Sequence, residues 1–326
     1  MSELRLSRRS LIAGMAALSG GALAGPAAFA QSPASGAGQS YFSRFKLGAL
    51  EGIVLSDGPV GPLGKAPDLY AGAPKEEVAQ LLAGSFSPEA VVLQQNVLFM
   101  TLGDGRRVLF DTGIGAAKAF GPNSGRLLGN LAAAGIDPGA IDAVVLTHAH
   151  PDHCWQLADE TGAALFPKAQ IFMTEADFGF WTDEAKLGND AIKDMIAGTR
   201  KVLLPLKDRM TFIADGTEIL PGVQSQFTPG HTVGHTSFVL TAGSDRLLLI
   251  GDVVHHHILS LERPQYAFAF DSDPELGVAT RRKTLDMVAA DRLPILSFHF
   301  PWPGIGHVAR SGDGFRYYAA PVQTEL

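Results

Sequence analysis

Short apolar runs separated by turn residues recur through most of the chain and predict a protein rich in β-strands. Residues 97–102 and 107–110 flank a Gly-Asp-Gly turn at 103–105, so they predict a β-hairpin. A short continuous apolar run is typical of a buried strand. Such runs predict further strands at residues 143–146, 169–173, 223–227, 237–241, 247–250 and 294–297.

Longer segments with polar residues at their ends lie between these strands and predict helices. Helices are expected at residues 124–134, 175–181 and 274–290. Ser124 and Asp273 are the N-caps expected for the first and third helices, and Gly135 is the expected end of the first. Strands precede helices in each half of the chain. Two such halves, packed sheet to sheet with helices outside, give an α/β fold of the αββα four-layer sandwich type in a single domain.

Composition allows a large core and excludes some classes of function. The chain has 326 residues, of which 46% are hydrophobic and 18% are charged. Its net charge is −7 and its longest run of cations covers only residues 281–283, so no nucleic-acid partner is expected, because phosphate binding needs clustered cations. The single cysteine, Cys154, excludes an intramolecular disulfide and zinc sites built from several cysteines.

The first thirty residues are interpreted as a targeting signal rather than as part of the folded domain. Arg8 and Arg9 precede a mildly apolar stretch that ends in a small-x-small pattern at Ala28 and Ala30, which resembles a twin-arginine export signal. The stretch is too weakly apolar for a stable membrane span, although an N-terminal anchor is the alternative. Cleavage after Ala30 predicts a periplasmic protein that is not inserted in a membrane. The expected organisation is a signal peptide at 1–30, a flexible lead-in at 31–40 and one domain at 41–326.

The clearest chemical signal is a histidine cluster after the strand expected at 143–146. His148, His150, Asp152 and His153 lie within six residues there. His148 and His150 would face the same way on a strand, and a turn after them lets Asp152 and His153 point to a second position nearby. Burying four such groups together without a metal would be costly, and imidazole and carboxylate suit a divalent cation such as Zn²⁺.

Three more side chains follow other apolar runs in the same way. They are His231, Asp252 and His299. Ligands at the ends of several strands converge on one edge of a sandwich, so these residues are expected to complete the site.

This set of motifs, with Asp111 in Phe110-Asp111-Thr112-Gly113 upstream, resembles the metallo-β-lactamase-fold hydrolases. The resemblance implies two Zn²⁺ ions, one held by His148, His150 and His231 and the other by Asp152, His153 and His299. Asp252 and a hydroxide would bridge the ions, with that hydroxide as the nucleophile and with Asp252 and Asp152 as the catalytic side chains. Asp111 would orient a ligand histidine. His235 is expected to hold the loop that carries His231.

The bridging Asp252 points to the esterases, lactonases, thioesterases and phosphoesterases of this fold. Three C-terminal segments, at 270–273, 281–283 and 299–307, resemble the methyl parathion hydrolase group. One feature departs from that group, because Cys154-Trp155-Gln156 stands where two glycines are usual. The form His-Ala-His-Pro-Asp-His-x-Trp also resembles a sister group of exported hydrolases, which includes an aryl-chloride dehalogenase.

Aromatic residues are the candidates for the substrate pocket. The resemblance implies an aromatic wall, and the expected binding residues are Phe120, Trp181, His255, Phe270 and Trp302. Their alternative role is ordinary core packing. The run His255-His256-His257 is interpreted as a pocket rim with one inward ring, with a third metal site as the alternative. Asp57, in Ser56-Asp57-Gly58-Pro59, is interpreted as a turn residue.

The favoured function is therefore an exported binuclear zinc hydrolase for a small-molecule ester, lactone or phosphotriester, with an aryl group. Other enzymes remain open, namely a hydrolytic dehalogenase of chloroaromatics and an enzyme of the N-acyl homoserine lactonase type. A periplasmic metal-binding protein without turnover is the non-enzyme alternative. The sequence also leaves open a homodimer.

Overall fold

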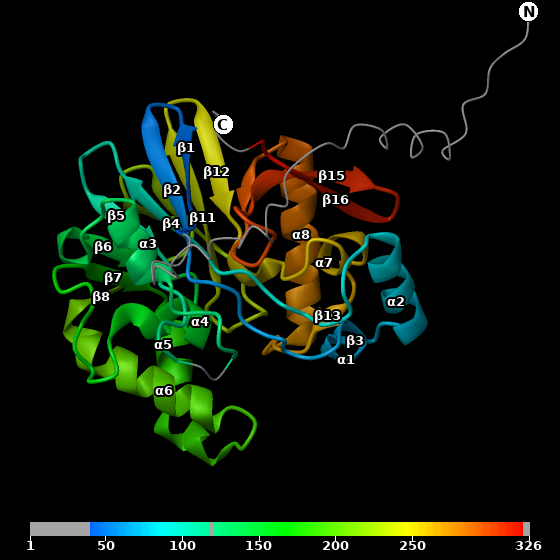
Figure 1. The fold of residues 1–326 in the computed structure, drawn as a ribbon, viewed down its shortest axis with the longest axis horizontal. Helices are drawn as coiled ribbons and strands as arrows, with labels where there is room; N and C mark the ends of the chain where they lie inside the picture. Colours follow the sequence, from blue (N-terminus) through cyan, green and yellow to red (C-terminus); the bar gives the residue numbers. More distant parts are fainter. Residues whose placement is uncertain (1–39, 118–119, 322–326) are drawn as a thin grey trace, which may run out of the picture. The chain divides into compact units, whose positions relative to one another are not determined.

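Two seven-stranded sheets form the centre of the molecule, as Figure 1 shows for the computed structural model. The structure describes residues 40–117 and 120–321. The predicted signal peptide at 1–30 and the lead-in at 31–40 lie outside the described residues, apart from Ser40.

The first sheet has the strand order β1-β2-β4-β5-β6-β7-β8. Its strands are β1 (Phe42–Leu47), β2 (Leu50–Ser56), β4 (Asn96–Thr101), β5 (Arg107–Phe110), β6 (Ala143–Val145), β7 (Gln170–Met173) and β8 (Met210–Phe212). Strands β4 and β5 form the predicted hairpin. Strands β5 to β8 run parallel to one another, so their C-terminal ends lie at the same edge of the sheet.

The second sheet has the order β16-β15-β14-β12-β11-β10-β9. Its strands are β9 (Glu218–Leu220), β10 (Val223–Phe227), β11 (Thr236–Ala242), β12 (Asp245–Leu249), β14 (Ile295–Leu296), β15 (Ile305–Ser311) and β16 (Gly314–Ala319). Only β12 and β14 pair in parallel within it. A separate pair, β3 (Tyr70–Ala71) with β13 (Ala267–Phe268), was not predicted, because two-residue strands leave no periodic pattern.

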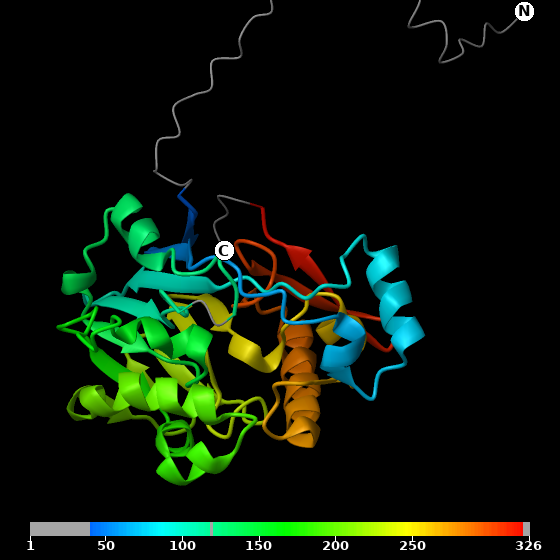
Figure 2. The same ribbon diagram turned by 60° about the horizontal axis from the view of Figure 1, so that its bottom comes forward.

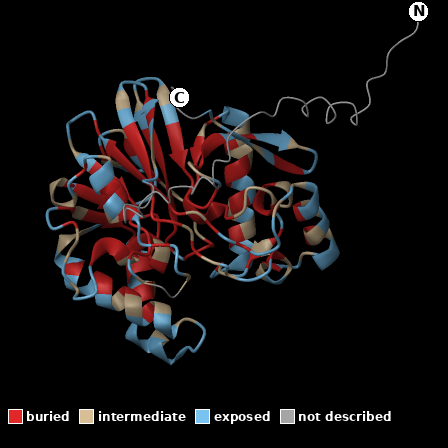
Figure 3. Cartoon of the chain, viewed as in Figure 1, coloured by how far each residue is buried: buried red, intermediate tan, exposed pale blue. Residues whose placement is uncertain are grey.

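A layer of buried apolar side chains joins the two sheets. Val108 and Val145 from the first sheet lie in one cluster with Phe238 and Leu247 from the second. Figure 3 shows the strands as largely buried. Each large apolar side chain buried in this way contributes about 1.5–3 kcal/mol to folding, so this layer holds the sheets face to face.

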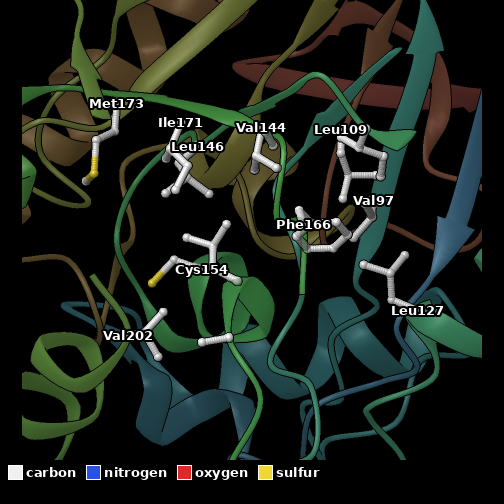
Figure 4. Close-up of a cluster of buried hydrophobic side chains, with 14 of the residues drawn as sticks. Val97, Leu109, Leu127, Val144, Leu146, Cys154, Phe166, Ile171, Met173 and Val202 are labelled. Carbon is white, nitrogen blue, oxygen red and sulfur yellow. The ribbon is translucent and has the colours of Figure 1, made fainter. Parts of the chain in front are cut away.

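Helices cover the outer face of the first sheet. They are α3 (Leu127–Ala133), α4 (Pro151–Cys154), α5 (Glu175–Thr182) and α6 (Lys193–Leu203), with short 3-10 turns η1 (Pro138–Ala140), η2 (Trp155–Leu157), η3 (Glu184–Gly188) and η4 (Leu204–Arg209). Figure 4 shows part of the cluster beneath them, where Leu127, Cys154 and Val202 lie near strand residues such as Val144 and Ile171.

The predicted start of α3 at Ser124 is wrong. The helix begins at Leu127, whose amide donates to the carboxylate of Asp57 at 2.8 Å, and the cap position is Arg126. Asp57 is therefore a buried acceptor at a helix start rather than only a turn residue. The predicted end at Gly135 is confirmed, since this glycine has a φ of 80°, a conformation that costs a glycine little.

The second sheet is covered by α8 (Pro274–Asp291), with α7 (Leu259–Glu262) nearby and η5 (Gly251–Val253) after β12. Asp273 caps α8 as predicted, because its side chain accepts from the amide of Leu276. In Figure 2 the strands lie between the green helices and α8 in orange, so the αββα prediction is confirmed. Two further helices, α1 (Ala66–Leu69) and α2 (Lys75–Gly84), pack beside β3. Among the helices of the described ranges, none combines the length and apolarity that a membrane span needs.

Candidate metal centre

One edge of the sandwich collects the ends of strands from both sheets. His148 follows β6 of the first sheet, whereas His231, Asp252 and His299 follow β10, β12 and β14 of the second. Because parallel strands end at the same edge, the two sheets bring these side chains together although they are up to 151 positions apart in sequence. All four are almost fully buried.

His148, His150 and His231 form the first group of ring nitrogens. Their candidate ligand atoms lie within 4.8 Å of one another, and His231 Nε2 is 2.8 Å from His150 Nδ1. Burial lowers the pKa of His148 and of His150 well below the usual value, and the neighbouring histidines lower it further. These two imidazoles are therefore neutral, with lone pairs available to a cation.

Asp152, His153 and His299 form the second group. Asp152 Oδ2 is 3.7 Å from His153 Nε2 and 3.6 Å from His299 Nε2. The short helix α4 explains this placement, because it starts directly after His150 and turns Asp152 and His153 away from the strand direction. Pro151 at its first position favours that start.

Asp252 lies between the two groups. Its Oδ2 is 3.3 Å from His231 Nε2 and 3.0 Å from His299 Nε2, and its Oδ1 is 3.3 Å from His153 Nε2. Burial raises the pKa of this carboxyl, but the charges of His299, His153 and His255 outweigh burial and hold the pKa well below its usual value. Asp252 is thus a carboxylate that faces both groups. The structure brings together all seven side chains that the sequence singled out.

The donor set fits divalent cations. His148 Nε2, His153 Nε2 and Asp252 Oδ1 are buried and have no hydrogen-bond partner. An unpaired buried polar atom costs about 1–3 kcal/mol, so three of them converging on one space is an arrangement that a cation would relieve. Neutral imidazoles with carboxylates are ligands typical of zinc.

Asp111 orients the rings of this cluster. Its Oδ2 accepts from His153 Nδ1 and from the hydroxyl of Thr147, both at 2.9 Å, and its Oδ1 accepts from the amide of Thr147 at 2.8 Å. Asp111 has a φ of 59°, which is unusual for a residue other than glycine. The turn after β5 therefore places this carboxylate at some conformational cost, as expected of a residue that positions a ligand.

His235 holds Asp252 itself rather than only the loop of His231. Its Nε2 accepts from the amide of Asp252 at 2.9 Å, while its Nδ1 donates to Thr228. Burial lowers the pKa of His235 to about 3, so Nε2 keeps the lone pair that this bond needs. Gly251 allows the close approach, because a Cβ there would lie 2.6 Å from His235 Nε2.

Two supporting carboxylates escaped the sequence analysis. Asp271 accepts from His231 Nδ1 at 3.0 Å. Asp177, on α5, accepts from the amides of Ala149 and Gly234 at 2.8 and 2.7 Å, and so joins the two loops that carry histidines of the first group. Asp271 lies in a segment noted only for its resemblance, and Asp177 gave no signal in the sequence, because acidic residues such as Glu175 and Asp177 are common in the first turn of a helix.

A cavity of about 450 Å³, a volume that includes the space at its opening to solvent, lies over the cluster. Phe120 and Phe270, which were predicted to bind substrate, line it. Its apolar walls also include Val60, Leu63, Leu93, Met195 and Phe268. Among the described residues that line it there is no Lys or Arg, and Asp152 and Asp252 are the carboxylates at its floor.

Trp181 and Trp302, which were also predicted to bind substrate, are not among the residues that line this cavity. Trp181 is 2% exposed on α5, and its ring meets that of His150 edge-on, with centroids 4.7 Å apart. Trp302 packs against the layer between the sheets, because the turn before β15 directs it there.

The inward ring of the histidine run is His255, and it lies within the cavity rather than at its rim. It is buried, stacks on Phe268 and has its Nε2 3.2 Å from Asp252 Oδ2. Both ring nitrogens lack a hydrogen-bond partner. His231, Asp252 and His255 could also hold a cation between them. His256 and His257 instead stack on each other.

Comparisons with known proteins agree with this geometry. A model of the family described as the metallo-beta-lactamase superfamily matches residues 90–299, which include all seven side chains. The solved structure of AidC, described as a dizinc quorum-quenching lactonase, is 26% identical with a TM-score of 0.79, and the match covers 87% of this chain and 99% of that one. The hydrolase AbOPH, described as in the beta lactamase superfamily, is 27% identical with a TM-score of 0.79, covering 88% of this chain and 100% of that one.

A curated relative is more distant. Cleavage and polyadenylation specificity factor subunit 3-I of Arabidopsis thaliana is 26% identical over 175 residues, which are 50% of this chain. The match spans only 24% of that relative's own length.

Proposed function

We propose that this chain, a metal-dependent hydrolase that belongs to the metallo-beta-lactamase superfamily, cleaves uncharged lactones or esters that carry an apolar or aryl group. His148, His150 and His231 would hold one zinc ion, and Asp152, His153 and His299 a second, with Asp252 shared between them. Zinc supplies a Lewis acid for the substrate carbonyl and lowers the pKa of water that it coordinates.

The charge of the cavity carries the proposal for the substrate class. Among the described residues that line the cavity there is no Lys or Arg. The two carboxylates that line it, Asp152 and Asp252, belong to the proposed metal centre. Protein sites for phosphate and carboxylate groups usually supply a cationic side chain to match the charge. An anionic group on the part of the substrate away from the metals would find none here, whereas an apolar group would bury surface against the walls.

Phe120, Phe268 and Phe270 favour a flat, apolar substituent. Offset or edge-to-face contacts with an aryl ring contribute about 0.5–1.5 kcal/mol beyond the area they bury. His255 adds a polar group to this wall, and burial lowers its pKa to about 4. Its Nε2 lies 3.2 Å from Asp252 Oδ2, so this nitrogen faces the proposed metal centre.

The similarity to AidC supports a lactone as the first substrate to test. A phosphotriester is also uncharged, and the resemblance of the C-terminal segments to the methyl parathion hydrolase group keeps it as a prediction. The chloroaromatic dehalogenase stays a prediction in the same way.

The decisive experiment is a substrate panel with metal-loaded protein. It would contain an aryl lactone, an N-acyl homoserine lactone, an aryl ester, a phosphotriester, a phosphodiester and a chloroaromatic. We expect the highest kcat/KM on a lactone or ester, little turnover of the phosphodiester, and loss of activity after chelation. Preference for the phosphodiester, or full activity without metal, would contradict the proposal.

A matched pair of variants serves as the control for this panel. His150→Ala should reduce kcat by several orders of magnitude, whereas His307→Ala, at an exposed position on β15, should leave kcat and metal content unchanged. Equal loss in both variants would point to general sensitivity of the fold.

We also propose export to the periplasm. The support is Arg8 and Arg9 before an apolar stretch and the small residues Ala28 and Ala30. Replacing both arginines by lysine should leave unprocessed precursor in the cytoplasm, and N-terminal sequencing of the exported protein should find Gln31 first. Unchanged processing of the double variant would argue against this route.

A further inference from the structure

We propose that Arg281 is a positioning residue for the metal centre. Its buried guanidinium holds Asp271 against His231 and fixes the backbone beside Asp252, and it thereby raises the affinity of the metal position formed by His148, His150 and His231. The inference rests on the proposed function, since it assigns a new residue to the same site.

Arg281 lies in the middle of α8 and is 1% exposed. A buried guanidinium costs several kcal/mol unless its donors are paired, so its partners indicate what holds it there. Its Nε donates to the carbonyl of Val253 at 2.8 Å, and its Nη1 donates to the carbonyl of Tyr266 at 2.6 Å. Its Nη2 donates to Asp271 Oδ2 at 3.2 Å.

Asp271 passes this constraint to His231. One carboxylate oxygen, Oδ2, accepts from Arg281 and from the amide of Phe268, and the other, Oδ1, accepts from His231 Nδ1 at 3.0 Å. Because a carboxylate can only accept here, His231 carries its proton on Nδ1. Its Nε2 lone pair then faces His150 Nδ1 and Asp252, where a cation would lie.

The second contact reaches the shared carboxylate. Val253 directly follows Asp252, so the bond from Arg281 Nε fixes the peptide next to it. Tyr266 precedes the segment that carries Phe268, a wall of the cavity. Only a side chain with several donors in a rigid fork can hold these segments together, which explains arginine rather than lysine at this position.

The other metal position is supported by different residues. His153 Nδ1 donates to Asp111, and His299 Nδ1 donates to the carbonyl of Gln94 at 2.8 Å. Neither contact involves Arg281. Asp271 contacts His231, whereas the other ion is linked to Arg281 only through the shared Asp252. Loss of Arg281 should therefore weaken binding of the ion at His231 by roughly 10- to 100-fold, which is typical of removing a residue that orients a metal ligand, and binding of the other ion far less.

The experiment measures the zinc affinity of the purified protein by competition with chelators of graded strength. We expect Arg281→Met and Asp271→Asn to lower the affinity for one of the two zinc ions 10- to 100-fold and to change the affinity for the other by no more than about 3-fold. The affinity of Arg281→Lys should lie between those of these variants and the wild type, because lysine keeps the charge but lacks the forked set of donors. Arg282→Met, at the next and exposed position of α8, is the matched control and should change neither affinity.

A double-mutant cycle separates positioning from general stability. The effects of Arg281→Met and Asp271→Asn on affinity should be strongly non-additive, whereas those of Arg281→Met and Asp111→Asn should add. The absorption spectrum of the cobalt-loaded Arg281→Lys protein should change at one site only. Equal weakening of both ions, or additivity with Asp271→Asn, would overturn the inference. Wild-type protein that binds fewer than two ions would instead overturn the metal centre on which it rests.

Discussion

Cys154 is adjacent in sequence to His153, yet its thiol faces the core. Its Sγ donates to the carbonyl of Ala149 at 3.5 Å, and the side chain is fully buried beneath the helices. Burial raises the pKa of this thiol well above its usual value, and nearby carboxylates raise it further, so it is protonated at neutral pH. It therefore lacks the thiolate that a nucleophile needs.

We expect Cys154→Ser to keep kcat/KM within about 3-fold and to lower the free energy of unfolding by about 1 kcal/mol, the size typical of a modest core substitution. Enzyme kinetics and urea denaturation measure the two effects. Loss of activity with two metal ions still bound would indicate covalent catalysis by this cysteine.

Trp181 and Phe270 provide a second test at the scale of single residues. Both were predicted to bind substrate, but the structure places them differently. Trp181 packs on His150, whereas Phe270 lines the cavity. Trp181→Ala should cost about 3–5 kcal/mol of stability and lower metal occupancy and kcat. Phe270→Ala should raise KM for aryl substrates with metal content unchanged. Enzyme kinetics and metal analysis of both variants test these roles. If Trp181→Ala raises KM without changing kcat or metal content, Trp181 binds substrate after all.

At the scale of elements, local patterns were sufficient where local bonds define the element. The hairpin of β4 and β5 and the cap of α8 by Asp273 depend on residues near in sequence, and both were predicted. The start of α3 was not, because its first amide bonds to Asp57, 70 positions earlier. No local pattern records such a partner.

Asp57 links the end of β2, the loop after β5 and the start of α3, and its burial predicts how the stability of the fold depends on pH. It accepts from the amides of Ile114, Gly115 and Leu127 and is fully buried. Burial raises its pKa from 3.8 to about 6, although these bonds lower it. A carboxyl that binds its proton more tightly when folded stabilises the fold below its unfolded pKa, and this stabilisation is lost as pH rises through the folded pKa.

The stability of wild type relative to Asp57→Asn should therefore fall between about pH 4 and 6, by about 3 kcal/mol in total, and stay level above that range. Urea denaturation of both proteins across this range measures the difference, in which titrations shared by both proteins cancel. A difference that does not vary with pH would show that Asp57 is already ionised at pH 4 in the folded state.

At the scale of the whole molecule, the metal centre lies where the two sheets meet. The proposed ligands His148, His150, Asp152 and His153 follow a strand of the first sheet, and the other three follow strands of the second. The sequence could identify these ligands because few other roles suit clustered histidines at strand ends. It could not identify Asp177 or Arg281, whose roles depend on partners brought close only by the fold.

Ions held from both sheets should cross-link the two halves of the sandwich, so metal removal should lower thermal stability. A ligand that binds only the folded state stabilises it by about 4 kcal/mol at 1,000 times its dissociation constant. We expect the Tm to fall after chelation, to return with added Zn²⁺ and to rise further with zinc concentration.

Mg²⁺ is the matched control, because it prefers oxygen ligands in octahedral geometry and should not restore the Tm. His231→Ala removes a ligand that follows the second sheet and should shrink the zinc-dependent shift. A Tm independent of zinc would mean that the layer of apolar side chains alone holds the two sheets together.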